Sequence, residues 1–185
     1  MEKKSEKWKV KSSKYLMQKP WCTLREDHVV LNNGAEIPNY YVLEYPNWVN
    51  IIAITKEKEY LLVKQYRHGL QQIDYELPAG VCDETDSSPL ATAKRELLEE
   101  TGYGNGTWRE LTVVSANPGT HTNLCYCFIA TGVEKIGAQQ LDTAEELELV
   151  KLNLKTLKEI LLSDQIKQSM HAAPLWKYIA VNNLL

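Results

Sequence analysis

The feature that most constrains this chain is a short helix that carries three glutamates within five residues. The sequence predicts this helix over Pro89–Thr101. Ser88 is a favourable N-cap residue, and proline suits the first helical position. Gly102 is well placed to end the helix in the left-handed conformation. A helix with such defined ends requires a core against which to bury its apolar face.

The apolar residues of this helix gather on one broad arc, which includes Ala93 and Leu97. Glu96, Glu99 and Glu100 lie on the opposite arc, which we expect to face away from the core. Like charges at this spacing destabilise a helix, and crowding raises carboxylate pKa values. A bound hard cation reverses this cost, because carboxylate oxygens are ligands that Mg²⁺ prefers. A solvated acidic face is the alternative interpretation of the glutamates taken alone.

Composition narrows the class of protein. The chain has 185 residues, of which 44% are hydrophobic and 24% charged, and its net charge is −3. These values are typical of a soluble globular protein and give no reason to expect nucleic acid as a partner. No apolar run approaches the roughly 20 residues of a membrane span, and the N-terminus lacks the apolar core of a signal peptide. We therefore expect a cytoplasmic protein with no membrane partner.

Four cysteines, at positions 22, 82, 125 and 127, have no accompanying histidine cluster. A zinc site is therefore not favoured, and we interpret Cys125 and Cys127 as buried free thiols on one face of a strand.

Strand-like segments outnumber helical ones along the chain. They are VNIIAIT (49–55), YLLVKQY (60–66), LTVVS (111–115), LCYCFIA (124–130) and LELVKL (147–152). Two amphipathic segments near the end, 154–163 and 174–185, indicate helices. This pattern predicts an α+β fold in which helices pack on a mixed sheet. We divide the chain into a small antiparallel β unit over residues 1–47 and a main domain over residues 48–185.

The segment RELLEETGY, residues 95–103, resembles the core of the Nudix box, REUxEExGU, in which U is apolar or aromatic. The segment LPAG, residues 77–80, precedes it by a short loop. The resemblance implies a Nudix fold, with a mixed β-sheet sandwiched by helices. It also implies hydrolysis of nucleoside diphosphates linked to another group, with Mg²⁺ as cofactor and Mn²⁺ able to replace it.

The loop between these two segments departs from the family pattern. Gly80 lies fifteen residues before Arg95, one residue more than in the family. The glutamate that the family has in this loop therefore corresponds either to Asp86 or to Ser87. This departure puts the strength of the catalytic activity in question more than the fold.

A longer segment, LLVKQYRHGLQQIDYELPAG (61–80), is similar to the Nudix subfamily that cleaves ADP-ribose and related nucleoside diphosphate sugars. The similarity extends over about residues 50–165. It implies a homodimer in which N-terminal strands pack against the partner. It also implies that water attacks one phosphate of the diphosphate and releases two monophosphates.

The resemblance also implies roles for individual residues. The metal ligands are three carboxylates and one backbone carbonyl, those of Glu96, Glu99, Glu100 and Ala79. Arg95 lies four residues before Glu99 and can orient it through an ion pair, in a catalytic or a purely structural role. Glu145 corresponds to the general base, and its neighbours Asp142 and Glu146 are the alternatives. A solvated turn is the other interpretation of these three acids.

Four further residues correspond to substrate contacts in similar enzymes. Arg67 corresponds to a phosphate contact, and its alternative role is a salt bridge to Glu76. Glu76 is itself a candidate for a polar contact with the base or ribose. Trp21 and Tyr41 correspond to aromatic residues that stack on the adenine, with Tyr40 as the alternative to Tyr41. Packing in a core is the competing explanation of both aromatics.

The leading hypothesis is therefore a Nudix pyrophosphatase acting on a nucleoside diphosphate sugar. Two alternatives stay open: a Nudix hydrolase acting on CoA or nucleoside triphosphates, and a catalytically weakened ligand-binding or regulatory module. The longer loop, Ser87 and the segment HTN (121–123) motivate the second alternative.

Overall fold

The computed structural model describes residues 7–143 and 145–185. The chain divides into two compact units, each with its own network of contacts. The smaller comprises the residues up to Pro46 together with Asn117–Asn123, and the larger comprises Asn47–Ala116 and Leu124–Leu185. Residues 117–123 are far along the chain from the small sheet but bond to its end, where the Leu43 N–H donates to the carbonyl of Thr120 at 2.7 Å.

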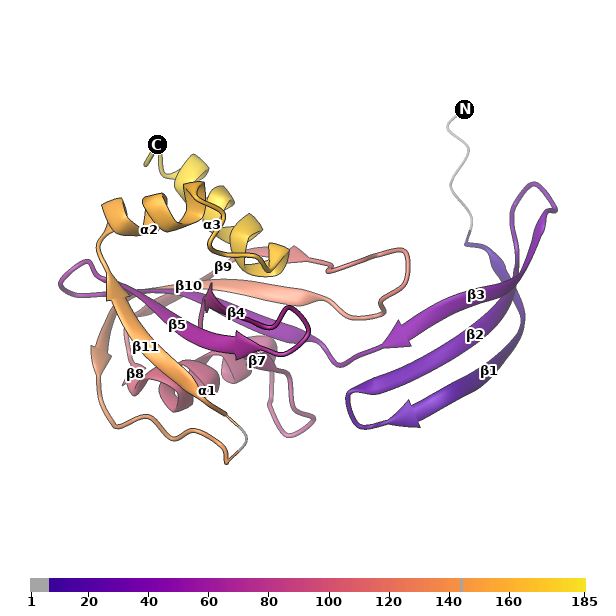
Figure 1. The fold of residues 1–185 in the computed structure, drawn as a ribbon, viewed down its shortest axis with the longest axis horizontal. Helices are drawn as coiled ribbons and strands as arrows, with labels where there is room; N and C mark the ends of the chain where they lie inside the picture. The colour runs from indigo at the N-terminus through magenta and orange to yellow at the C-terminus, as the bar shows by residue number, and fades with distance from the viewer. Residues whose placement is uncertain (1–6, 144) are drawn as a thin grey trace. The chain divides into compact units, whose positions relative to one another are not determined.

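The smaller unit is an antiparallel sheet of three strands in the order β1-β2-β3 (Figure 1). The strands are β1 (Lys9–Lys19), β2 (Cys22–Val30) and β3 (Glu36–Glu44). The predicted small antiparallel β unit is therefore confirmed. Every residue of β1 is exposed, so this sheet has no second layer of its own that covers the strand.

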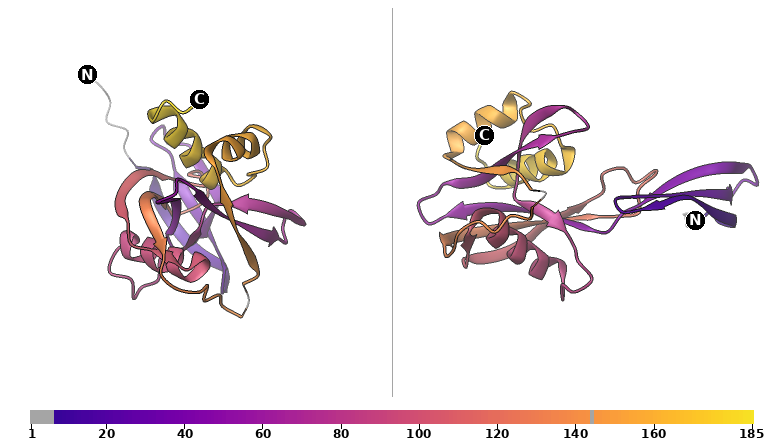
Figure 2. Two further views of the ribbon diagram at one scale, coloured as in Figure 1. Left: turned by 90° about the vertical axis from the view of Figure 1, so that its left-hand side faces the viewer. Right: turned by 60° about the horizontal axis from the view of Figure 1, so that its bottom comes forward.

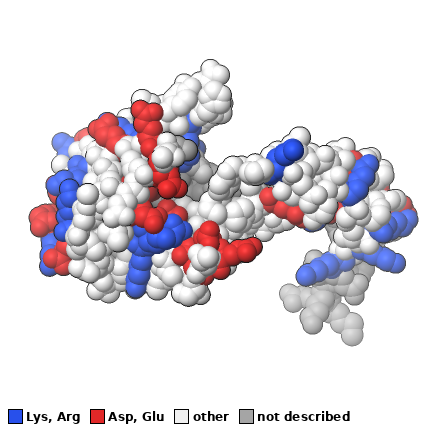
Figure 3. Space-filling view, turned by 90° about the horizontal axis from the view of Figure 1, so that it is seen from below, with Lys and Arg blue, Asp and Glu red and all other residues white. Residues whose placement is uncertain are grey.

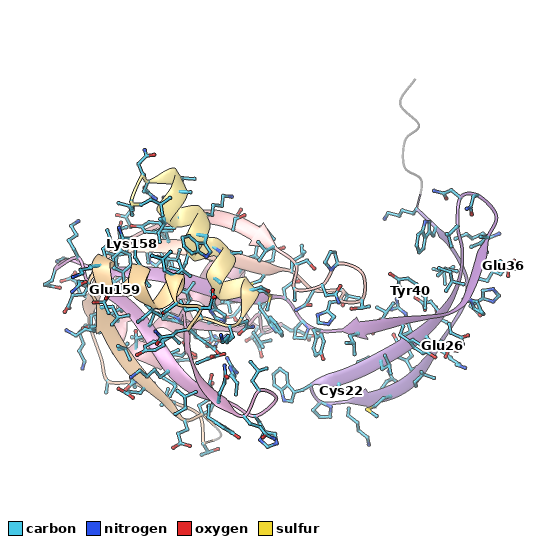
Figure 4. All side chains as sticks on the ribbon, turned by 45° about the horizontal axis from the view of Figure 1, so that its top comes forward. Cys22, Glu26, Glu36, Tyr40, Lys158 and Glu159 are labelled. Carbon is cyan, nitrogen blue, oxygen red and sulfur yellow. The ribbon has the colours of Figure 1, made fainter. Side chains whose placement is uncertain are left out.

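Ion pairs link neighbouring strands of the small sheet. The Arg25 guanidinium contacts Asp27 on its own strand at 2.9 Å and also Glu44 on β3. Glu26 and Glu36, whose side chains project from this sheet (Figure 4), pair with Lys14 and Lys11 of β1. Charge pairing thus contributes to an assembly that buries few apolar side chains.

The larger unit is built on one mixed sheet. Its strands are β4 (Trp48–Thr55), β5 (Tyr60–Arg67), β6 (Gln72–Glu76), β7 (Ala79–Val81), β8 (Tyr103–Gly104), β9 (Thr107–Val114), β10 (Cys125–Lys135) and β11 (Leu147–Leu152). The main order is β11-β5-β4-β10-β8, with β6 beside β5, β7 beside β4 and β9 beside β10. Strands β4 and β10 are parallel, and the other pairs are antiparallel.

Helices cover both faces of this sheet: α1 (Pro89–Thr101) lies on one face, and α2 (Leu154–Leu162) and α3 (Ser169–Val181) lie on the other (Figures 1 and 2). The alternation of β4 explains the arrangement. Ile51 packs in the cluster that includes Leu97 of α1, whereas Ile52 packs in the cluster that includes Leu157 of α2. The predicted α+β class, with a mixed sheet between helices, is confirmed.

The predicted ends of α1 are those observed. The hydroxyl of Ser88 accepts a hydrogen bond from the Ala91 N–H at 3.2 Å. Gly102 ends the helix with φ of 73°, and its N–H donates to the carbonyl of Leu98 at 2.8 Å. Local capping residues therefore determined these limits, as the sequence indicated.

The start of the last helix differs from the prediction, which placed it at Pro174. Helix α3 begins at Ser169 and includes Pro174. A proline inside a helix leaves the carbonyl four residues earlier without its usual partner, here that of Met170. The side chain of Asn50, buried on β4, donates to this carbonyl at 2.6 Å. A distant strand thus satisfies the group that the proline leaves free.

Three short strands, β6, β7 and β8, were not predicted from the sequence. All four cysteines are free thiols, and Cys125 and Cys127 are buried, as expected. Among the described residues, none of the helices has the length and apolar character needed to span a membrane.

Candidate functional site

The site forms where β7 passes directly over the acidic side of α1. A Cβ atom on Gly80 would lie only 2.0 Å from the carboxyl carbon of Glu96. Any other residue at this position would push the glutamate away, so glycine permits the contact. Gly80 pairs with Val49 of β4, which fixes β7 on the central sheet. The backbone of the LPAG segment is thus held against the first glutamate of the helix.

Glu100 is held by a hydrogen bond from Ala79, the residue before Gly80. Its Oε2 atom accepts a hydrogen bond from the Ala79 N–H at 3.0 Å. Glu96 and Glu100 are both buried, with 8% and 7% of their surface exposed. We expected the acidic arc to face away from the core and into solvent, but at these two residues it is covered. The reason is β7, a strand that periodicity along the helix could not reveal.

Burial outweighs the partners of both carboxylates, although the Arg95 guanidinium lies 2.9 Å from Glu96. Burial raises the pKa of Glu96 to about 7, against the opposing charge of Arg95. Burial also raises the pKa of Glu100 well above its ordinary value, although the Ala79 N–H bond opposes this, and the nearby charge of Glu96 adds to it. Two carboxylates buried together in this way favour a positive ligand, because a cation would restore both to the charged form.

Arg95 connects the third glutamate to the loop. Its guanidinium donates to Glu99 at 2.8 Å and to Asp86 at 2.9 Å. The predicted ion pair between Arg95 and Glu99 is present. Asp86 also accepts from the Thr92 hydroxyl at 2.9 Å, so it bridges the loop to the helix.

This bridge settles which loop residue faces the helix. The sequence left two alternatives, Asp86 and Ser87, and it is Asp86 whose carboxylate contacts Arg95. The loop also contains a turn at Asp83, whose carboxylate accepts from the Thr85 N–H at 2.8 Å. The longer loop therefore keeps an acid next to the helix.

Arg67 and Glu76 form a pair at the ends of β5 and β6. The Arg67 guanidinium donates through two nitrogens to the two carboxylate oxygens of Glu76, with the Nε bond at 2.6 Å. Glu76 is 2% exposed, while the Arg67 side chain is 44% exposed. The salt bridge considered as the alternative role of Arg67 thus exists. The negative charge of Glu100 also helps to raise the pKa of Arg67, after the larger effect of Glu76, so the pair lies near the acidic helix.

Glu145 lies in the exposed segment before β11. Its Oε2 atom accepts a hydrogen bond from the Asp142 N–H at 3.1 Å, which folds the segment into a turn. Its charge contributes to the raised pKa values of both Glu96 and Glu100. Glu145 is therefore near the two buried carboxylates, as a general base would have to be. The solvated turn is also observed, so this geometry is compatible with both interpretations.

Trp21 and Tyr41 belong to the smaller unit and are exposed, at 72% and 49%. They are thus not core residues of the small sheet. The alternative aromatic, Tyr40, donates its hydroxyl hydrogen to the Gly119 carbonyl and packs edge-on against Trp8. Tyr41 is therefore the more available ring of the two tyrosines.

The donor set fits a hard cation in part. Across residues 7–143 and 145–185, no three His, Cys, Asp or Glu side chains form a group that could hold a metal ion. Glu96 and Glu100 nevertheless supply two buried carboxylates, and the backbone of Ala79 is bonded to one of them. Oxygen donors of this kind suit Mg²⁺ or Mn²⁺, which accept ligands from water and substrate for the remaining positions. Glu99, held by Arg95, is the third candidate ligand.

The charged surface around α1 is mixed. Seen from below, the side on which α1 lies in Figure 1, acidic side chains of the larger unit gather beside basic ones (Figure 3). Such a surface offers contacts to a ligand that carries phosphates and a cation together.

Several residues of this site were not found from the sequence. Gln140 and Gln139 bond the segment after β10 to the end of α1, through the carbonyls of Glu99 and Glu100 at 2.8 and 2.7 Å. His171 of α3 lies 3.7 Å from Glu76. No local pattern in the sequence points to these residues, because each acts through a contact with a distant segment.

Comparison with known protein families gives two matches. Residues 8–43 match the nucleoside diphosphate sugar hydrolase N-terminal domain, and residues 45–173 match the NUDIX domain. The second match covers more than half of the chain and contains α1, β7 and the Arg67–Glu76 pair.

Several curated proteins are similar in sequence. A methanol dehydrogenase activator from Bacillus methanolicus is 33% identical over 147 residues, which is 79% of this chain and 78% of that protein. An ADP-ribose pyrophosphatase from Bacillus subtilis is 28% identical over 71% of this chain and 74% of its own length. An ADP-ribose pyrophosphatase from Mycobacterium tuberculosis is 35% identical over 62% of this chain and 55% of its own length.

A solved crystal structure of an ADP compounds hydrolase has a similar fold. The TM-score is 0.84, and the match covers 99% of this chain and 100% of that one, at 18% sequence identity. At this identity the likeness concerns the fold alone.

Proposed function

This chain belongs to the family of NUDIX-domain hydrolases, and from that premise we propose that it hydrolyses the diphosphate bond of ADP-ribose or a related nucleoside diphosphate sugar. The observation that carries the proposal is the pair of buried carboxylates, Glu96 and Glu100, together with the half-exposed guanidinium of Arg67, on which Glu100 acts electrostatically. A cation bound by the former and a phosphate bound by the latter would lie next to each other. The match of residues 8–43 to a domain of nucleoside diphosphate sugar hydrolases supports the substrate class.

NUDIX hydrolases generally use a divalent metal ion, and we propose Mg²⁺, held by Glu96, Glu99, Glu100 and the Ala79 carbonyl. The ion supplies positive charge that neutralises the diphosphate and favours ionisation of the attacking water. Arg95 keeps the Glu99 carboxylate in place through its bond at 2.8 Å. Arg67 donates from its free edge to a phosphate oxygen, while its other edge stays bonded to Glu76.

Glu145 accepts the proton of the attacking water. Water forms a bond to one phosphorus while the bond from that phosphorus to the bridging oxygen breaks, so that ADP-ribose gives AMP and ribose 5-phosphate. Support for this role is the proximity of Glu145 to both buried carboxylates.

Trp21 and Tyr41 stack on the base of the substrate. Trp21 has a φ of 62°, a conformation in which a bulky residue is strained. Strain of this kind is retained where a side chain is needed in one position. The exposure of both rings supports a binding role over a packing role.

We further propose that the protein is a cytoplasmic homodimer. The small sheet exposes a group of large apolar side chains: Trp8, Val10, Tyr15, Leu16 and Met17. Exposed apolar groups of this size favour association with a second surface. The four free thiols are consistent with a reducing compartment.

A turnover screen tests the proposed function. The purified protein with Mg²⁺ is incubated with ADP-ribose, other nucleotide sugars, CoA and nucleoside triphosphates, and the products are separated by chromatography. We expect two monophosphates from ADP-ribose or another nucleotide sugar, and none from a Glu100→Gln control. Cleavage of CoA or a triphosphate alone would contradict the proposed substrate class.

A regulatory function is the second candidate. It is favoured by the similarity to a protein named as an activator of methanol dehydrogenase. No turnover across the screen, together with a rise in melting temperature on adding ADP-ribose, would support this candidate and exclude the first.

A further inference from the structure

His171 is a buried histidine whose role the proposed chemistry leaves unexplained. It lies in the first turn of α3, on the face of the sheet opposite to α1 (Figures 1 and 2), and only 3% of its surface is exposed. Histidine is costly to bury unless its nitrogens have partners. Both nitrogens of His171 face the segment that joins β6 to β7.

The two ring nitrogens have different neighbours. Nδ1 accepts a hydrogen bond from the Leu77 N–H at 3.1 Å. Because Nδ1 uses its lone pair in this bond, the proton of the neutral ring is on Nε2. Nε2 lies 3.7 Å from the Oε2 atom of Glu76, which is a close electrostatic contact but longer than a hydrogen bond. Burial lowers the pKa of His171 to about 4, which keeps the ring neutral near pH 7.

Glu76 therefore has a polar neighbour on each of two sides. Arg67 donates to both of its oxygens from the β5 side, and His171 faces Oε2 from the α3 side. The Glu76 carboxylate is fully enclosed, whereas nearly half of the Arg67 side chain is exposed. The exposed guanidinium thus lies at the end of a row of three side chains, of which the other two, Glu76 and His171, are buried.

We propose that His171 is a positioning residue: it fixes Glu76, which in turn holds the guanidinium of Arg67 in the orientation that receives a substrate phosphate. This inference rests on the proposed function, in which Arg67 contacts the diphosphate. A guanidinium fixed before binding loses less freedom when the ligand arrives. The inference assigns α3 to substrate affinity, although α3 lies across the sheet from the carboxylates of α1.

The hydrogen bond from the Leu77 N–H also connects His171 to the backbone between β6 and β7. Leu77 is two residues before Ala79, whose N–H bonds to Glu100. His171 therefore contacts both the side chain and the backbone that lead into the site.

Two substitutions of His171 test the proposal. His171→Leu removes both polar contacts, whereas His171→Gln keeps an amide donor that can face Glu76. For the substrate found in the screen, we expect His171→Leu to raise KM by about tenfold with kcat within about twofold, the pattern expected when binding is weakened equally in the ground and transition states. We expect His171→Gln to restore KM to near the wild-type value.

A stability control separates positioning from folding. Leu175→Ala removes a fully buried side chain of the same helix that packs in the core containing Leu157 and Ile179. All variants are assayed well below their melting temperatures. A KM increase with Leu175→Ala equal to that with His171→Leu would overturn the proposal, since it would show a general effect of loosening α3.

A double-mutant cycle gives the decisive readout. Arg67→Lys keeps the charge but cannot form the two-bond contact with Glu76. If His171 acts through Arg67, His171→Leu has no further effect on KM in the Arg67→Lys background. Full additivity of the two KM effects would overturn the inference even if the protein is active.

A failure of the proposed function can be distinguished from a failure of the positioning role. If the wild-type protein cleaves nothing in the screen, the same cycle is measured by calorimetric binding of ADP-ribose, with the same tenfold loss and lack of additivity expected. Binding of ADP-ribose that does not change with His171→Leu, or absence of binding, would overturn the positioning role as well.

Discussion

Carboxylates occur in two very different settings in this protein. In the small sheet, the partners Lys14, Arg25 and Lys11 lower the pKa values of Glu26, Asp27 and Glu36, respectively. On α1, burial raises the pKa values of Glu96 and Glu100.

The carboxylates in the two settings contribute differently to the stability of the fold. A paired carboxylate is most stable in its charged form within the folded protein, so it stabilises the fold. A buried carboxylate without a cation destabilises the fold when it is charged, and this cost is recovered when a cation binds. The small sheet therefore uses acids for structure, and α1 holds them ready for a ligand.

The largest effect is expected from Glu100→Gln. Loss of its charge should lower kcat/KM by about 10³-fold or more, because charge stabilisation of this kind is worth several kcal/mol in the transition state. The amide oxygen can still accept the Ala79 N–H, so the melting temperature without metal should stay the same or rise. Kinetics and calorimetry measure the two effects. Glu110→Gln, at an exposed residue of β9, is the control. Near-normal turnover of Glu100→Gln would exclude Glu100 as a metal ligand.

Glu145→Gln should have the next largest effect, because removing a general base lowers kcat by a factor of about 10² to 10⁴. KM should change little, since the residue is proposed to act on water and not on the substrate. Steady-state kinetics of Glu145→Gln and of the neighbouring Glu146→Gln provide the comparison. A large increase in KM with normal kcat would make Glu145 a binding residue.

The third prediction concerns pH without metal. The folded pKa of Glu96, about 7, is above its ordinary value of 4.5. The folded protein therefore binds more protons than the unfolded chain between these values, and the free energy of unfolding falls as pH rises from about 4.5 to 7. The shift corresponds to a loss of at most about 3 kcal/mol. Melting temperatures in EDTA should show this fall, and Glu96→Gln should reduce it. An equal fall in the variant would contradict the assignment to Glu96.

A smaller effect is expected in the small sheet. Arg25→Gln removes the partner of Asp27, which is 4% exposed, and should cost about 1 kcal/mol of stability. Hydrogen exchange should become faster in β1–β3 and stay unchanged in α1. Faster exchange in both places would show that the two settings are not independent.

The smallest effect is expected from Lys14→Gln. Lys14 is well exposed, and its ion pair with Glu26 spans β1 and β2 at the surface. Exposed pairs of this kind contribute little, so the melting temperature should not change measurably. A clear decrease would mean that pairing in the small sheet is as important as burial on α1.

Much of the fold followed from local signals in the sequence. Ser88 and Gly102 defined α1, and the segment LELVKL gave the limits of β11 without error. Capping and alternation act within a few residues, so they can be read directly. The start of α3 could not be read in this way, because the side-chain carboxamide of Asn50 compensates for Pro174 from a strand more than a hundred residues away.

The residues of the site likewise divide into those that a local sequence pattern identifies and those whose contacts depend on tertiary packing. The Nudix-like segment identified Glu96, Glu99 and Glu100 and their relation to Arg95. It did not show that Gly80 covers Glu96, nor that His171 faces Glu76, because both contacts depend on tertiary packing. The longer loop was ambiguous until the carboxylate of Asp86 was seen beside Arg95.

The parallel pairing of β4 with β10 has a consequence for how the protein folds. Trp48 lies opposite Cys125, so the centre of the sheet joins segments that are far apart in the chain. Contacts of such long range form late, because the intervening loop must close first. During synthesis, β4, β7 and α1 all leave the ribosome before β10 does. Strand β7, which lies against Glu96 and Glu100, pairs with β4 and not with β10. The two carboxylates can therefore be covered before the centre of the sheet closes, and we expect the pairing of β4 with β10 to be a later step than the assembly of the site.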